Sequence, residues 1–286
     1  MTFVNRARCL GVLLFTGAML CCVPAASGQT ADLAGEYANV GHEDAMERAG
    51  GPPLGDYLGI PLTEAGRMRA ESNDEAIWGL PEFSCRPHPG PYQWRAAGGV
   101  QIRKEIDPVT RELTAFHINW QRSLDRIIYL DGRPHPDDMA AHSWSGFSTG
   151  EFNGNVLKVT TTHLKESYLK RNGVMFSDKA KMTEYIYRRG DYLTIMMLLE
   201  DPYYLTEPWI QTTNYRWAPN TQMEIFPCTV IDEGLANRQV PHFLPGGNPY
   251  LLEFTGPNNI PPEAAKGGAE TMYPEYRSKF KKNSNN

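Results

Sequence analysis

From residue 100 onward, apolar and polar residues alternate in short runs that are separated by Gly, Asn, Asp and Pro. Val100, Ile102 and Ile106, for example, alternate with polar neighbours. A period of two places successive side chains on opposite faces of a β-strand. The runs that predict strands cover residues 100–106, 112–120, 126–130, 144–152, 156–163, 181–188, 192–200, 209–217 and 222–226.

Most of these runs are joined by short turns. Asn153-Gly154 is the strongest short-range hairpin signal, and Gly190-Asp191 and Asp131-Gly132 are similar. The predicted fold class is therefore all-β, an antiparallel meander of about eight or nine strands. A meander of this size closes readily into a barrel with a cavity large enough for one small ligand.

Regions with a different composition flank the predicted barrel. A helix is predicted to begin after Thr63, a suitable N-cap residue, and short helices are predicted at 45–49 and 261–265. The predicted organisation is a signal peptide, an irregular N-terminal arm packing on the barrel, the barrel core, and a C-terminal covering segment with a mobile tail. These regions span residues 1–28, 29–98, 99–230 and 231–286.

The first 28 residues have the order of a secretory signal. Arg6 and Arg8 precede the apolar stretch 10–23, and small residues at 26–28 form a cleavage site that leaves Gln29 as the mature start. This predicts a periplasmic or secreted protein. A lipid anchor at Cys21 or Cys22 is the weaker alternative, because neither residue follows a small one.

Removal of that signal leaves two of the five cysteines, Cys85 and Cys228. Two cysteines in an oxidising compartment predict one disulfide, and two separate thiols are the alternative. The formal charge falls from −5 to −7 when Arg6 and Arg8 are removed. An acidic chain argues against a nucleic-acid partner, and no segment of the mature chain is long and apolar enough to span a membrane.

Two motifs resemble a known family. Asp131-Gly132-Arg133-Pro134-His135-Pro136 is followed by a hairpin at 150–160, and the similarity extends to Ser177, Glu184 and the segment 201–208. The chain is similar to exported bacterial proteins with a DGRPHP box and a GxWxGDTLVV-like hairpin. Asn155 and Phe152 depart from that pattern, which has Asp and Trp there. The resemblance implies a lipocalin-like barrel and no particular chemistry.

The loop after residue 130 is the first candidate site. Asp131, Arg133 and His135 lie within it, and an acid such as Glu151 or Glu184 near a histidine can orient the ring for general-base work. These five residues are the predicted catalytic group. The loop is expected at the open end of the barrel, where connections between strands lie. The structural alternative is a turn at Asp131 with Arg133 paired to a carboxylate such as Glu151 or Asp201.

Other chemistries receive less support from the sequence. Histidines 117, 135, 142 and 163 could supply metal ligands with Glu184 or Glu151, but no spacing is diagnostic, so no metal and no cofactor are predicted. The threonines at 160–162 are good strand formers, and no nucleophile elbow or phosphate-binding loop is present.

Aromatic residues recur through the predicted strands and suggest a second site. Trp120, Trp144, Tyr185 and Trp209, with His142, are the predicted ligand contacts of an aromatic-lined interior, although cores also need aromatic volume. The sequence therefore favours a barrel that binds a small hydrophobic or aromatic molecule. The alternatives are a periplasmic lyase, isomerase or hydrolase with a His/Arg/acid site at the barrel mouth, and a structural role.

Overall fold

The computed structural model describes most of the chain after the predicted signal. The described residues are 32–40, 52–57, 59–73, 84–88, 90–94, 98–120, 125–170, 172–221, 228–230, 242–267, 270 and 273–281. The predicted signal peptide, the helix expected at 45–49 and the strand expected at 222–226 lie outside them. No helix of the described part of the chain is long and apolar enough to cross a membrane.

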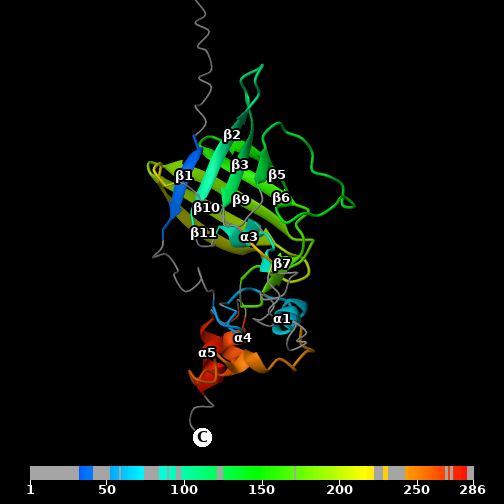
Figure 1. Ribbon diagram of the computed structural model, residues 1–286. Coiled ribbons are helices and arrows are strands. Elements are labelled where there is room, and N and C mark those ends of the chain that lie inside the picture. Colours follow the sequence, from blue (N-terminus) through cyan, green and yellow to red (C-terminus); the bar gives the residue numbers. More distant parts are fainter. Residues whose placement is uncertain are drawn as a thin grey trace, which may run out of the picture.

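Nine strands form a closed barrel, which confirms the predicted fold class (Figure 1). Around the barrel the strands follow the order β1-β11-β10-β9-β6-β5-β4-β3-β2. Their bounds are β1 Gly35–Asn39, β2 Val100–Ile106, β3 Leu113–Trp120, β4 Arg126–Tyr129, β5 Phe147–Asn153, β6 Val156–Thr162, β9 Lys181–Arg189, β10 Tyr192–Glu200 and β11 Trp209–Trp217.

Two of the three predicted hairpin turns are confirmed, whereas Asp131-Gly132 forms no hairpin because β4 and β5 are parallel. Gly154 and Gly190 adopt φ angles of +59° and +57°, and they join β5 to β6 and β9 to β10. Glycine occupies this left-handed region without the steric penalty of a Cβ atom. The alternation along β10 is also regular, because Leu193, Ile195 and Leu199 point inward and are buried.

Two features differ from a simple antiparallel meander. The strand β1 comes from the arm that was expected to be irregular, and it closes the barrel by pairing with both β2 and β11. Only Tyr37 at its centre is buried, so its sequence carries no strong alternation. The second difference is that β4 and β5 are parallel, with Ile128 opposite Ser148. Parallel neighbours require a crossover, and residues 130–146 provide it.

Packed side chains fill the described interior of the barrel. The short helix α3 (Gly90–Gln93) is entirely buried, and Trp94, which follows it, contacts Trp120 edge to face at 4.7 Å between ring centroids. The hydroxyl of Tyr215 donates to the carbonyl oxygen of Trp94 at 2.9 Å. A Cβ atom added to Gly90 would lie 2.9 Å from the buried Met182 side chain of β9, so α3 packs against the barrel wall.

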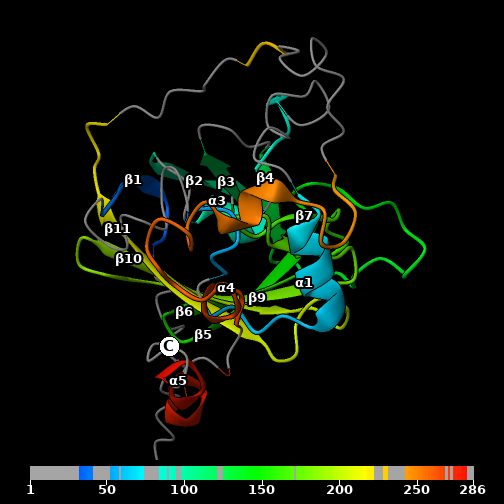
Figure 2. The ribbon, with the colours of Figure 1, turned by 90° about the horizontal axis from the view of Figure 1, so that it is seen from below.

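A second layer lies across one end of the barrel (Figure 2). It contains α1, the small sheet of β7 and β8, η4, α4 and α5, and the C-terminal segment packs on α1 and its neighbours. The main-chain nitrogen of Tyr57 donates to Ala265, and Arg67 donates to Lys266. The predicted helix at 261–265 is present, whereas α5 occupies a tail that was expected to be mobile. The bounds are α1 Glu64–Glu71, β7 Ser167–Tyr168, β8 Met175–Phe176, η4 Pro249–Leu252, α4 Pro262–Lys266 and α5 Pro274–Lys281.

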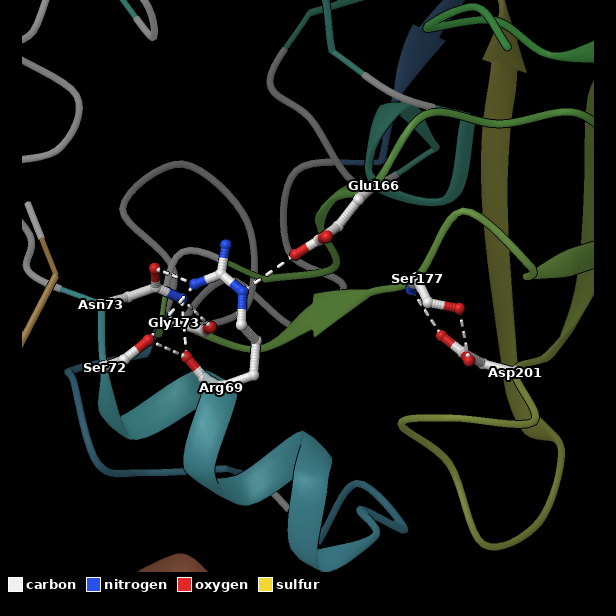
Figure 3. Close-up of polar contacts among 7 residues, drawn as sticks. All are labelled: Arg69, Ser72, Asn73, Glu166, Gly173, Ser177 and Asp201. Atoms are coloured by element: carbon white, nitrogen blue, oxygen red, sulfur yellow. Dashed lines mark hydrogen bonds and ion pairs between the residues drawn. The ribbon is translucent and has the colours of Figure 1, made fainter. Parts of the chain in front are cut away.

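The α1 helix is capped as predicted, since the Thr63 side chain accepts a hydrogen bond from the nitrogen of Gly66. Near its C-terminal end, Arg69 donates to Glu166 at 2.9 Å and to Asn73 at 2.9 Å (Figure 3). The amide nitrogen of Asn73 donates in turn to the carbonyl oxygen of Gly173. These bonds fix α1 to the segment that carries β7 and β8.

The predicted disulfide is confirmed. Cys85 and Cys228 are bonded, with 5.7 Å between their Cα atoms and a sequence separation of 143. The bond ties the segment before α3 to residues beyond β11. Because the bond closes such a long loop, it restricts the unfolded chain and raises the free energy of the unfolded state by about 4–5 kcal/mol in the chain-entropy treatment.

Candidate functional site

The crossover of residues 130–146, which we call the arch, runs along the outside of the barrel (Figure 1). It starts at the end of β4 and must return to the beginning of the parallel strand β5. Its far end is fixed to the segment after β6, because Ser143 donates its main-chain N–H to His163 and accepts that of Lys165, both at 2.9 Å. The predicted position at the open end of the barrel is therefore wrong, and the loop covers the outer wall.

A pocket of about 260 Å³ lies between the arch and that wall. On the strands, its side chains belong to outward-facing positions of β5 and β6, and the arch supplies the opposite side. The described lining residues are Gly132, Arg133, His135, Thr149, Gly150, Glu151, Lys158 and Thr160. Three of the five predicted catalytic residues, Arg133, His135 and Glu151, thus meet at one site.

His135 connects the arch to both strands. Its Nε2 lies 2.8 Å from the Thr149 hydroxyl on β5, and its Nδ1 lies 2.7 Å from the Thr162 hydroxyl on β6. The ring also packs edge to face on Phe147, with 5.3 Å between centroids. Burial of the ring, together with the electrostatic influence of His163 and Lys181, lowers the pKa of His135 below its ordinary value. This shift favours the neutral form of the imidazole at pH 7.

The hydrogen bonds continue from Thr162 to His163. The Thr162 hydroxyl lies 2.8 Å from Nδ1 of His163, and Nε2 of that ring lies 2.8 Å from the carbonyl oxygen of Asp137 in the arch. His163 has a φ angle of +57°, which is uncommon for a residue with a Cβ atom. The ring of His142 packs against it at 5.2 Å and lies 2.9 Å through Nδ1 from the carbonyl oxygen of Leu164.

The charged groups of the pocket are held in pairs. Arg133 donates to Asp131 at 2.5–2.9 Å, and its guanidinium lies 3.7 Å from the centroid of the Tyr129 ring. These hydrogen bonds lower the pKa of Asp131 and raise that of Arg133. Lys158 pairs with Glu151 at 3.1 Å. Both pairs are exposed and contribute little stability, so their charges remain accessible to a ligand.

Glu184 does not belong to this pocket. Its carboxylate lies inside the barrel and forms a two-pronged ion pair with Arg126, whose side chain is 1% exposed while that of Glu184 is 0% exposed. Trp94 donates its indole N–H to the same carboxylate, and Arg126 also donates to Ser148 and Thr161. The prediction that Glu184 joins the loop histidine is therefore wrong, because alternation along β9 directs it inward.

Asp201, the other acid proposed near Arg133, has a different role. It accepts hydrogen bonds from the nitrogen and the hydroxyl of Ser177 at 2.6 and 2.8 Å (Figure 3). These bonds join the ends of β8 and β10. Arg133 pairs instead with Asp131, two residues away.

The predicted aromatic ligand contacts do not surround one described space. Trp120 packs against Trp94 in the core, whereas Tyr185 faces outward from β9. Trp144 lies under Arg86 and Lys165, with cation-to-centroid distances of 4.6 and 5.0 Å, and Trp209 contacts Lys170 at 5.5 Å. Trp120 and Trp209 both pack on the main hydrophobic core, and none of the four rings lines the pocket beneath the arch.

Sequence reasoning missed several residues of the two polar clusters. Thr149 and Thr162 contact His135, yet threonine in a strand is ordinary and gives no separate signal. The sequence predicts Arg126 only as the first residue of a strand; its place on the same strand face as Ile128 is the signal that could identify it as inward-facing. Across the described residues, no three His, Cys, Asp or Glu side chains form a group that could hold a metal ion.

No family model, curated protein or solved structure matches the chain.

Proposed function

We propose that this protein is exported and binds a small polar molecule that carries a carboxylate, in the pocket between the arch and strands β5 and β6. The observation that carries the proposal is the convergence of Arg133, His135, Thr149 and Lys158 on a space of about 260 Å³. The space is slightly smaller than the usual range for drug-sized ligands, so it suits a small metabolite.

The side chains of the pocket favour an anionic ligand. Arg133 and Lys158 are cations, and Glu151 is the only acidic side chain among the described lining residues. Arg133 is already oriented by Asp131 and the Tyr129 ring, which lowers the entropy cost of forming a bond to a carboxylate. An incoming carboxylate would bind Lys158 in competition with Glu151, whose side chain is 72% exposed and loses little on leaving.

The apolar ligand suggested by the aromatic residues is the less supported alternative. Trp94 and Tyr215 fill the barrel with buried rings, and Arg126 and Glu184 occupy inward positions of the wall. An apolar ligand placed there would separate hydrogen-bonded charges without replacing their partners, at a cost of several kcal/mol. The proposed export agrees with the disulfide between Cys85 and Cys228, a bond typical of oxidising compartments.

Isothermal titration calorimetry tests this proposal with three probes: succinate, glucose and indole. We expect succinate to bind, with affinity lost in Lys158→Ala. Lys104→Ala is the matched control, since Lys104 forms an exposed pair with Asp32 on another part of the molecule. Binding of indole or glucose without succinate would contradict the proposal, as would equal succinate binding in Lys158→Ala and the unmodified protein.

A further inference from the structure

The hydrogen-bond chain through His135 ends on a hydroxyl that lines the pocket. We propose that Thr149 is a nucleophile, that His135 is its general base, and that the pocket hydrolyses small esters that carry a carboxylate. This inference rests on the proposed function, because it uses the same pocket and the same class of ligand.

The donor and acceptor of each hydrogen bond in this series follow from its last acceptor, the carbonyl oxygen of Asp137. The carbonyl oxygen of Asp137 can only accept, so Nε2 of His163 donates to it, and in this Nε2–H tautomer Nδ1 accepts from the Thr162 hydroxyl. The Thr162 oxygen then accepts from Nδ1–H of His135, which leaves Nε2 of His135 as an acceptor. The Thr149 hydroxyl must therefore donate its proton to His135 at 2.8 Å.

This arrangement meets the geometric requirement for an activated hydroxyl. A nucleophile lies within hydrogen-bond reach of a base, and a third group orients that base. Thr162 and His163 act as positioning residues, since they hold the productive tautomer of His135. The left-handed backbone of His163 costs about 1–3 kcal/mol and persists only where surrounding contacts impose it.

The reaction balances with the groups present and water. The Thr149 oxygen attacks the ester carbonyl carbon while its proton passes to Nε2 of His135. The bond from carbon to the alcohol oxygen then breaks, and the same proton passes to the departing alcohol. Water repeats the sequence, which releases the acid and restores Thr149.

The two cations of the pocket, Lys158 and Arg133, can stabilise the negative charges in this reaction. Lys158 lies on β6 diagonally across from Thr149, since Glu151 is its direct partner and Thr160 is the partner of Thr149. Diagonal neighbours have Cα atoms about 7–8 Å apart, within the reach of a lysine side chain. Lys158 can thus stabilise the developing oxyanion, while Arg133 holds the substrate carboxylate.

The test uses the mono-4-nitrophenyl ester of succinic acid as the probe. We expect a rapid release of one equivalent of nitrophenolate and a succinyl group on Thr149, located by peptide mass spectrometry after an acid quench. Thr149→Val should abolish both signals and Thr149→Ser should retain them. His135→Gln should slow acylation by about 10²–10⁴-fold, the usual contribution of a general base.

A second readout distinguishes positioning from simple structural support. Thr162→Val should slow acylation and change its pH profile, and Thr162→Ser should restore both. Thr183→Val is the matched control, because Thr183 faces outward on β9 and lies outside the pocket lining. Acylation of Thr149→Val equal to that of the unmodified protein would overturn the assignment of the nucleophile.

The binding and acylation measurements test the two proposals separately. Succinate binding without acylation of the unmodified protein would overturn hydrolysis and leave the binding proposal standing. Absence of both would overturn the two proposals together.

Discussion

The buried pair of Arg126 and Glu184 gives the sharpest prediction for stability. Replacing Arg126 by Met keeps much of the side-chain volume but leaves the Glu184 carboxylate inside the barrel without its cation. Only the indole N–H of Trp94 then remains among its described donors. The Ser148 and Thr161 hydroxyls, which also accept from Arg126, still bond to each other at 2.9 Å.

The expected loss in the free energy of unfolding follows from these remaining contacts. Removing one member of a fully buried ion pair destabilises a protein by about 3–5 kcal/mol, because the remaining charge is uncompensated. The double variant Arg126→Met/Glu184→Leu removes both charges and should lose only about 1–3 kcal/mol, chiefly from the unsatisfied N–H of Trp94. The double variant is therefore expected to be more stable than the single one.

Urea unfolding, followed by tryptophan fluorescence with the disulfide intact, measures these free energies. Trp94 and Trp120 are buried and should report the loss of the core. Lys104→Met is the control, since it breaks an exposed pair that contributes about 0–1 kcal/mol. An Arg126→Met cost no larger than that of the control, or a double variant less stable than the single one, would refute the reasoning.

Three further predictions concern other parts of the molecule. Replacing both Cys85 and Cys228 by Ser should lower the free energy of unfolding by about 4–5 kcal/mol, measured against the oxidised parent; an unchanged value would contradict a role in limiting the unfolded state. The hydrogen bond from Glu105, with a further contribution from Asp125, raises the pKa of His117. The stabilisation from this pair is fully present below the unfolded-state pKa of about 6.5 and is lost as pH rises through the raised folded pKa. The free energy of unfolding measured across that pH range should therefore fall as pH rises. His117→Gln should remove this pH dependence. Gly146→Ala should lower the free energy of unfolding in urea by about 1–3 kcal/mol, because φ is +68° and the new Cβ would lie 2.6 Å from the carbonyl oxygen of Thr162. Gly132→Ala is the control and should lower it less, because Gly132 has a similar φ of +72° but open space around the position of the new Cβ.

Local patterns were sufficient to predict most of the barrel. The bounds predicted for β2, β10 and β11 are those of the structure, and the turn residues Gly154 and Gly190 join the expected hairpins. Alternation and turn chemistry are properties of neighbouring residues, so they can be recognised without the fold. The single disulfide could also be predicted from the sequence, because only two cysteines remain after the predicted signal is removed.

The features that the sequence did not predict depend on pairing between strands that are distant in the sequence. The strand β1 is defined by its partners β2 and β11 and not by its own sequence. The parallel pairing of β4 and β5 moves the arch from the barrel end to the outer wall, and no local pattern encodes that choice. The same shift brings His135 to Thr149 and Thr162, while the inward direction of Glu184 removes it from the site.

His135 also illustrates how the structure changes an expected mutational effect. As a surface residue, it would tolerate substitution within about 0.5 kcal/mol. Its two hydroxyl contacts and its packing on Phe147 tie the arch to β5 and β6, so removing the ring should cost more, about 1–2 kcal/mol. Functional tests at this position therefore need a parallel measurement of stability.

Native mass spectrometry of the protein purified from its own compartment tests the central claim most directly. The account predicts a bound small molecule that carries a carboxylate, is released on denaturation, and is lost from Lys158→Ala but retained by Lys104→Ala. An apolar molecule retained equally by both variants would contradict the assignment of the pocket beneath the arch as the ligand site.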